Sequence, residues 1–143
     1  MTLASLARKA ELFVRIWAWF VLVSVLLRLR PLPSLVRQLS TSRRSARPPI
    51  PPLRLGRAVS RSVSLLGYQP RCLTLSLVLY RLLGEQGESP ELVVGLPREP
   101  LDNKAHAWIE IGGLDVGPPP GRQGHEELAR YGGPRKEIEL RAS

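Results

Sequence analysis

The sequence predicts an α+β fold in which one apolar helix packs on a small antiparallel sheet. The helix is indicated by a strongly apolar run over residues 70–83. The sheet is indicated by an apolar segment at residues 91–96 and by an alternating segment at residues 105–111 that runs into a Gly-Gly turn. A helix followed by two or three antiparallel strands is an α+β arrangement.

The helix at residues 70–83 carries the only cysteine of the chain. Pro70 suits the first helical position, where its missing N–H costs no hydrogen bond, and Gly84 and Gly87 supply the stop. Cys72 then lies in the first turn, where free backbone N–H groups and the helix dipole favour an anion. This position favours a thiolate nucleophile, whereas a small apolar residue in a core helix is the structural alternative.

The strand predicted over residues 105–111 carries a histidine. Its alternation places Ala107 on one face and His106 on the opposite face, where the histidine could meet the cysteine helix. A cysteine nucleophile needs a base within hydrogen-bond reach. Cys72 and His106 are therefore the candidate catalytic pair, with a purely structural histidine as the alternative.

Three segments together resemble a known family. They are Arg71-Cys72-Leu73, residues 92–96 and His106-Ala107-Trp108-Ile109-Glu110. The sequence resembles the transglutaminase-like leader peptidase of lasso-peptide biosynthesis over about residues 54–117. The resemblance implies a papain/transglutaminase-like fold, with Cys72 as nucleophile and His106 as base.

The same family pattern has an aspartate on the next strand, twelve residues after the histidine, that orients the imidazole. Position 118 of this sequence is Pro118. The nearest carboxylate on that strand is Asp115, which is therefore the candidate third catalytic residue.

Hairpin geometry tests this assignment. A two-residue turn at residues 112–113 pairs Glu110 with Asp115, and this leaves Asp115 roughly 13 Å along the sheet from His106. Asp115 can orient the histidine only if a longer turn or a bulge shifts the register. Asp102, a backbone carbonyl and no orienting group at all are the alternatives.

Three further groups lie in or near these segments. The backbone N–H of Cys72, free in the first turn of a helix, is the natural oxyanion donor. Trp108 either walls the cleft beside the histidine or simply packs. His125 lies in a stretch rich in glycine and proline, where we expect a solvated loop residue.

Length and composition limit the class of protein. The 143 residues fit one ordinary domain with a modest core. One cysteine cannot form an internal disulfide, and no cluster of cysteine and histidine offers a structural zinc site. We therefore expect a reducing cytoplasm, no metal and no cofactor.

The net charge of +9 is unevenly distributed. Residues 1–70 hold 12 Lys and Arg against only Glu11, a balance of +11, whereas residues 71–143 hold 9 against 11, a balance of −2. A basic arm attracts nucleic acid, anionic lipid or an acidic protein. Since no zinc-finger, helix-turn-helix or RNA-recognition pattern is present, we expect no nucleic-acid partner.

A stretch rich in serine and proline over residues 40–52 is typical of an extended linker. We place a boundary near Pro48. It separates a basic, apolar N-terminal helical region at residues 1–47 from a transglutaminase-like catalytic domain at residues 48–143.

The N-terminal region contains an apolar segment at residues 12–29 that Pro31 and Pro33 should end. Its uncharged core, residues 16–27, is too short to span a bilayer comfortably, and no small-residue cleavage site of a signal peptide follows. Three interpretations remain open. The segment packs on the catalytic half, docks a partner protein or lies in a membrane interface.

Two further helices are predicted on either side of the linker. Ser34 can cap a short basic helix that ends near residue 39. A helix over residues 53–66 is indicated by apolar residues at helical spacing, namely Leu55, Val59, Val63 and Leu66.

Cys72, His106 and the resemblance together predict a cysteine peptidase, and the resemblance implies that it removes the leader from a ribosomally made lasso precursor. The chain has little room for a separate peptide-binding domain, so we expect that it does not recognise the leader alone. The resemblance implies a separate leader-recognition protein, and we expect this partner, or the lasso cyclase, to dock on the N-terminal region. A non-catalytic adaptor with peripheral membrane contact is one alternative function. A transglutaminase-type acyl transferase is another, because the same nucleophile and base serve both reactions.

Overall fold

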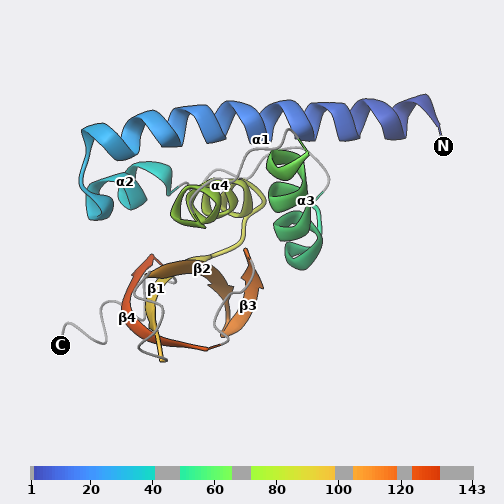
Figure 1. Cartoon of the computed structure of the whole chain (residues 1–143). Helices are drawn as coiled ribbons and strands as arrows, with labels where there is room; N and C mark the ends of the chain where they lie inside the picture. The colour runs from blue at the N-terminus through green and yellow to red at the C-terminus, as the bar shows by residue number, and fades with distance from the viewer. Residues whose placement is uncertain (1, 41–48, 66–71, 99–104, 119–123, 133–143) are drawn as a thin grey trace.

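The computed structural model describes residues 2–40, 49–65, 72–98, 105–118 and 124–132. Within these residues the chain forms four helices and four strands, and the predicted α+β fold is confirmed (Figure 1). In chain order the elements are α1 (Leu3–Leu29), α2 (Leu32–Leu39), α3 (Pro52–Ser64), α4 (Cys72–Glu85), β1 (Glu91–Pro97), β2 (His106–Ile111), β3 (Leu114–Gly117) and β4 (His125–Gly132).

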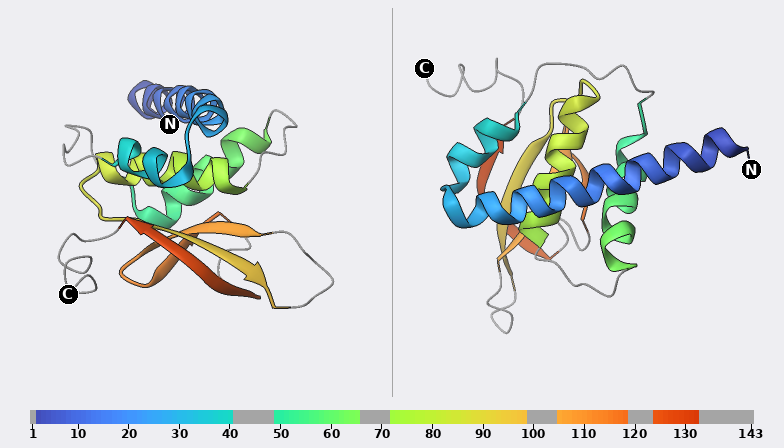
Figure 2. Two further views of the ribbon diagram at one scale, coloured as in Figure 1. Left: turned by 90° about the vertical axis from the view of Figure 1, so that its left-hand side faces the viewer. Right: turned by 90° about the horizontal axis from the view of Figure 1, so that it is seen from above.

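The molecule has three layers. The strands form one sheet in the order β3-β2-β1-β4, and all neighbouring strands are antiparallel. Helices α2, α3 and α4 lie on one side of this sheet, and α1 crosses them on the side away from it (Figure 2). Helix α4 is therefore enclosed between the sheet and α1.

This central position explains the composition of α4. Leu77, Val78 and Leu79 point to different sides of the helix, yet each is at most 1% exposed. A helix that is apolar all round suits a place with protein on every side. The predicted buried helix is confirmed from Cys72 onward, whereas Pro70 lies outside the described residues.

The predicted stop of α4 is confirmed at Gly87, whereas Gly84 lies inside the helix, which ends at Glu85. Gly87 has φ of +86°, and the amide of Glu88 donates to the carbonyl of Leu83 at 3.1 Å. This is a Schellman-type C-cap, which needs a residue without a side chain at the left-handed position.

Helix α1 is longer than the apolar segment indicated, and it packs on the helical layer. Its buried residues Ile16, Phe20 and Val23 belong to the same core as α4. Arg15 pairs with Glu85 of α4 at 2.6 Å, which fixes the two helices relative to each other.

The opposite face of α1 is apolar and exposed. We call it the outer stripe; its residues are Val14, Val21, Leu22, Val25 and Leu29. By length and composition α1 can also cross a membrane, a property that the core helix of a soluble protein or a signal sequence shares.

The two other predicted helices are confirmed with shifted ends. Helix α2 starts at Leu32, ahead of Ser34, because Pro31 and Pro33 both fit a helix N-terminus. In α3 the predicted face is buried through Leu55, Val59 and Val63, while Leu66 lies outside the described residues. Residues of α1 and α2 share one continuous core with α3, α4 and the sheet.

Strand β4 was not predicted. The expectation that His125 lies in a loop is wrong, because it is the first residue of a strand that pairs with β1 at both ends, with a register shift at Leu128. The sequence from Glu126 to Arg130 does not alternate and has low β propensity. Pairing with β1 therefore decides its conformation.

The predicted hairpin between β2 and β3 is confirmed in register. Glu110 pairs with Asp115, and the two turn glycines have φ of +56° and +85°, as a two-residue hairpin turn requires. The register then shifts, so that Ile109 pairs with Gly117. One extra residue on β3 forms a bulge beyond Asp115, on the side toward His106.

Candidate active site

The N-terminal end of α4 is attached to β2 through a single residue of the strand. The amide of Ala107 donates to Cys72 Sγ at 3.4 Å, and Ser76 Oγ donates to the Ala107 carbonyl at 3.1 Å. Cys72 and Ser76 are four residues apart, so they lie on one face of the helix. They bind both backbone groups of one residue and fix the helix start against the strand.

Strand pairing explains why Ala107 is available for these contacts. Strand β3 ends at Gly117, which pairs with Ile109. Beyond this point Cys72 and Ser76 of the helix form hydrogen bonds with the amide and the carbonyl of Ala107. Buried backbone groups need such partners. The cysteine sulfur is thus placed beside the residue that follows His106. The expectation that the histidine face of the strand meets the cysteine helix is wrong, because α4 packs on the face of Ala107 and Ile109.

His106 is 8% exposed and lies between two aromatic rings. Its ring centroid is 6.1 Å from that of Trp108, in a stacked arrangement, and 5.1 Å from that of His125. The imidazole also forms a hydrogen bond with the backbone of Pro118. Because proline has no N–H, the ring donates and the Pro118 carbonyl accepts.

Burial lowers the pKa of His106 below its usual value of 6.5, and the nearby His125 lowers it further. The hydrogen bond to Pro118 and the charge of Asp115 act in the opposite direction. The net direction keeps the imidazole neutral at neutral pH. A neutral imidazole is the form that can accept a proton from a thiol.

The carboxylate of Asp115 has a different hydrogen-bond partner. Its Oδ1 accepts from the amide of Gly117 at 2.9 Å, which closes a local turn at the bulge. The bulge lies beyond Asp115 and leaves it opposite Glu110. A backbone carbonyl, that of Pro118, is hydrogen-bonded to His106, and Asp102 lies outside the described residues.

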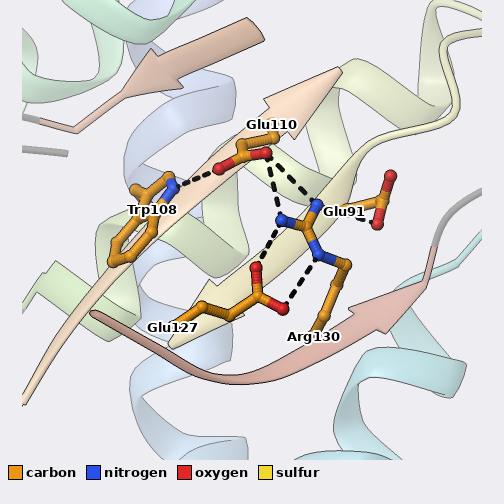
Figure 3. Close-up of polar contacts among 5 residues, drawn as sticks. All are labelled: Glu91, Trp108, Glu110, Glu127 and Arg130. Carbon is orange, nitrogen blue, oxygen red and sulfur yellow. Dashed lines mark hydrogen bonds and ion pairs between the residues drawn. The ribbon is translucent and has the colours of Figure 1, made fainter. Parts of the chain in front are cut away.

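Two other side chains of β2 form a polar network on the same face as His106. Trp108 and Glu110 are each 1% exposed, and Trp108 Nε1 donates to Glu110 Oε2 at 2.8 Å. Glu110 Oε1 accepts from both terminal nitrogens of Arg130 at 3.2 Å (Figure 3). Arg130 also pairs with Glu91 and Glu127.

The charge of Arg130 is fixed by this network. Hydrogen bonds to Glu127 raise its pKa most, burial opposes this, and Glu91 and Glu110 raise it further. The alternation of β2 predicted that Trp108, Glu110 and His106 share a face. Sequence reasoning missed the role of β4, which supplies both Arg130 and His125.

The described residues contain no group of three or more metal-ligating side chains. The described residues supply three groups at this site: the Cys72 thiol bound to the Ala107 amide, the neutral imidazole of the preceding residue His106, and the Pro118 carbonyl that binds the imidazole.

Comparison with known proteins places these features in a family. A model of the transglutaminase-like superfamily matches residues 17–130, which extends from α1 into β4. The chain matches no curated protein and no solved structure at a significant level. The family match covers most of the chain and contains both Cys72 and His106, so this chain belongs to the transglutaminase-like superfamily.

Proposed function

We propose that the protein is a cysteine peptidase that removes the leader of a ribosomally synthesised lasso precursor. One observation carries the proposal: Cys72 Sγ, at the start of α4, lies 3.4 Å from the amide of the residue that follows His106. The neutral state of His106 and membership of the superfamily support it. The choice of a lasso precursor rests on the resemblance of the three segments around Cys72, β1 and β2.

In the proposed reaction, the Cys72 thiol attacks the scissile carbonyl and His106 takes the thiol proton. The backbone N–H of Cys72 stabilises the oxyanion of the tetrahedral intermediate. His106 then gives the proton to the leaving amine, and a thioester remains on Cys72. Water, activated by His106, hydrolyses the thioester and restores the thiol.

The Pro118 carbonyl orients the base in this mechanism. It accepts one ring N–H of His106 and so leaves the other nitrogen free of that proton. Asp115 remains a candidate third residue, acting on His106 through its charge at a distance. No cofactor or metal has a role in the proposed reaction.

An acyl transferase that joins a glutamine side chain to an amine is the nearest alternative. It uses the same thioester on Cys72, and only the acceptor, an amine in place of water, differs. A product with a free carboxylate indicates the peptidase, and a product linked to an amine indicates the transferase.

The proposed peptidase works with a partner that grips the leader, and we place the docking site on the N-terminal region. The outer stripe of α1 offers apolar area, and basic residues at its ends, among them Arg8, Lys9 and Arg28, favour an acidic partner. The free thiol suits a reducing cytoplasm. The same stripe supports the rival function of a membrane-associated adaptor.

The first experiment mixes a synthetic lasso precursor and its leader-binding partner with the protein, and mass spectrometry identifies the products. Wild type should release leader and core peptides, each with a free terminus from water. Cys72→Ala should release neither, and Cys72→Ser, of nearly the same size, controls for packing. Cleavage by Cys72→Ala would refute the peptidase, whereas an amine-linked product would favour the transferase.

Point substitutions on the surface of α1 test the docking site better than deletion of the helix. Ile16, Phe20 and Val23 are part of the core, so a truncated chain would lose stability as well as the docking surface. Val21→Glu with Val25→Glu changes only the outer stripe. These changes should abolish the stimulation of cleavage by the partner. Leu114 is exposed on the β2–β3 hairpin, and Leu114→Glu is the matched control.

The same variants test the adaptor. If the adaptor function holds, wild type co-sediments with vesicles of anionic phosphatidylglycerol, the stripe variants do not, and Cys72 reacts slowly with iodoacetamide. Fast alkylation with no co-sedimentation would exclude it.

A further inference from the structure

Core packing does not explain why position 110 is a glutamate. It is a carboxylate that is 1% exposed on a strand beside an apolar core. Burying a carboxylate is costly unless it is paired and hydrogen-bonded, and an apolar residue of similar size often stabilises a protein as well or better. A specific geometric task would explain why a charged residue occupies this position.

The two oxygens of Glu110 have separate partners. Oε1 accepts the two terminal nitrogens of Arg130, and Oε2 accepts the indole N–H of Trp108 (Figure 3). Arg130 is held in turn by Glu91 of β1 at 3.0 Å and by Glu127 of β4 at 2.6 Å. The carboxylate thus links the indole of β2 to a guanidinium that is anchored on two other strands.

The indole is also restricted by the backbone beneath it. A Cβ atom built on Gly95 would lie 2.8 Å from Trp108 Cη2, so the ring occupies the space that a side chain on β1 would fill. Gly95 pairs with His106 across the sheet. The indole therefore extends from its hydrogen bond with Glu110 to the position beside the histidine.

The imidazole lies against this indole. The stacked rings of His106 and Trp108 are 6.1 Å apart, and His125 closes the other side at 5.1 Å. His125 begins β4 and Arg130 lies near its end, so both ends of one edge strand contact this face of β2.

We propose that Trp108, Glu110 and Arg130 are positioning residues for His106. The hydrogen bonds from Arg130 to Glu110 and from Trp108 to Glu110 fix the plane of the indole, and the indole fixes the imidazole of the residue that precedes the Cys72 contact at Ala107. The inference deepens the proposed function, because it rests on the pairing of Cys72 with His106. In the proposed reaction these three residues take no chemical step, and they act through His106.

The test uses the full-length protein and two readouts that need no precursor. The first is the rate at which iodoacetamide alkylates Cys72, the only thiol, as a function of pH. The second is proton NMR of the histidine rings. The chain has two histidines, so each Hε1 signal is assigned by replacing one of them with glutamine.

Three variants interrupt the chain of contacts at different points. Trp108→Phe keeps an aromatic ring but loses the indole N–H, Glu110→Gln loses the charge that Arg130 binds, and Arg130→Lys replaces the forked guanidinium with a point charge. We expect each to shift the His106 signal and to slow alkylation at neutral pH about 10-fold, because misplaced reacting groups lose rate steeply.

Ile109→Val is the matched control, since Ile109 belongs to the same strand and faces the core on the other side. It should lower the thermal midpoint while leaving the His106 signal and the alkylation profile unchanged. Arg130→Lys retains the charge on the edge strand, so it keeps the test valid if the Glu110 variant fails to fold.

Two negative results are distinguishable. If His106→Gln does not change the alkylation profile, the pairing of Cys72 with His106 is refuted, and the positioning role with it. If His106→Gln changes the profile but the three network variants match wild type in both readouts, the network is purely structural and only this inference is overturned.

Discussion

The two faces of β2 are both buried, but they are built in opposite ways. On one face Ala107 and Ile109 pack against α4, within the continuous apolar core. On the other face His106, Trp108 and Glu110 are almost as inaccessible, yet each has polar or ring partners. The first face is held by area removed from water and the second by directed contacts.

This difference suggests that one face of the strand provides stability and the other fixes geometry. Apolar packing stabilises strongly but tolerates small displacements, because dispersion and burial have little directionality. A network of hydrogen bonds and ion pairs adds little net stability, but it restricts geometry. The face that carries the proposed base, His106, is the restricted one.

The largest expected effect comes from the apolar face. Ile109 is fully buried, so Ile109→Ala should lower the free energy of unfolding by about 3 to 4 kcal/mol through lost burial and a cavity. Urea unfolding monitored by tryptophan fluorescence measures this. A loss below about 1 kcal/mol would mean that the core relaxes into the space, contrary to the rigid packing described.

On the polar face, the loss of stability should depend on whether Arg130 is replaced alone or together with Glu110. Arg130→Met leaves the Glu110 carboxylate buried without its guanidinium and should cost about 2 to 3 kcal/mol. Glu110→Gln combined with Arg130→Met should cost less than that single change, because position 110 then carries no buried charge, while Glu91 and Glu127 lose Arg130 in both variants. Additive losses in a double-mutant cycle would show that the two residues do not interact.

The sequence was sufficient to predict which residues share a face of β2, but not that both faces are buried. Alternation determines the faces directly. Burial of the polar face depends on β4, where a Glu-rich segment becomes a strand because it pairs with β1 and because Arg130 meets three carboxylates. Such long-range pairing leaves no local pattern.

The hairpin shows the same limit within the candidate site. The turn at residues 112–113 predicted the pairing of Glu110 with Asp115, because two glycines favour a two-residue turn. His106 is hydrogen-bonded to a backbone carbonyl, that of Pro118. Since every residue carries a carbonyl, no sequence signal could single it out.

The lowered pKa of His106 makes stability depend on pH. Between about pH 6.5 and the lower folded-state value, the unfolded chain binds a proton that the folded protein does not, so the free energy of unfolding falls as pH falls. The slope should approach at most about 1.4 kcal/mol per pH unit. His106→Gln should remove this part of the dependence, and an unchanged pH profile of urea unfolding would contradict it.

Ser76→Ala tests the attachment of α4 on the apolar side of the strand. The fully buried hydroxyl donates to the Ala107 carbonyl, so its loss should cost about 1 to 2 kcal/mol. Because Cys72 is bound to the same residue, alkylation of the thiol should change as well. Thr74→Ala, in the same helix turn, is the control. Equal alkylation in both variants would show that Ser76 does not help to place the thiol.

The smallest effect is expected at Asp115, where the two proposed ways of orienting His106 can be separated. Asp115→Asn removes the charge but keeps an oxygen that can accept the Gly117 amide, so the bulge should be preserved. The charge of Asp115 raises the pKa of His106, so its removal should lower that pKa slightly further. The Pro118 carbonyl still binds the ring.

We therefore expect Asp115→Asn to reduce kcat/KM for the precursor by no more than about 5-fold, equivalent to about 1 kcal/mol in the barrier. Asp115→Ala should have the larger effect of the two, because it also breaks the turn that carries Pro118 toward the histidine. A loss of about 10⁴-fold in Asp115→Asn, as when the orienting aspartate of a catalytic triad is neutralised, would show that the carboxylate reaches the imidazole once substrate is bound.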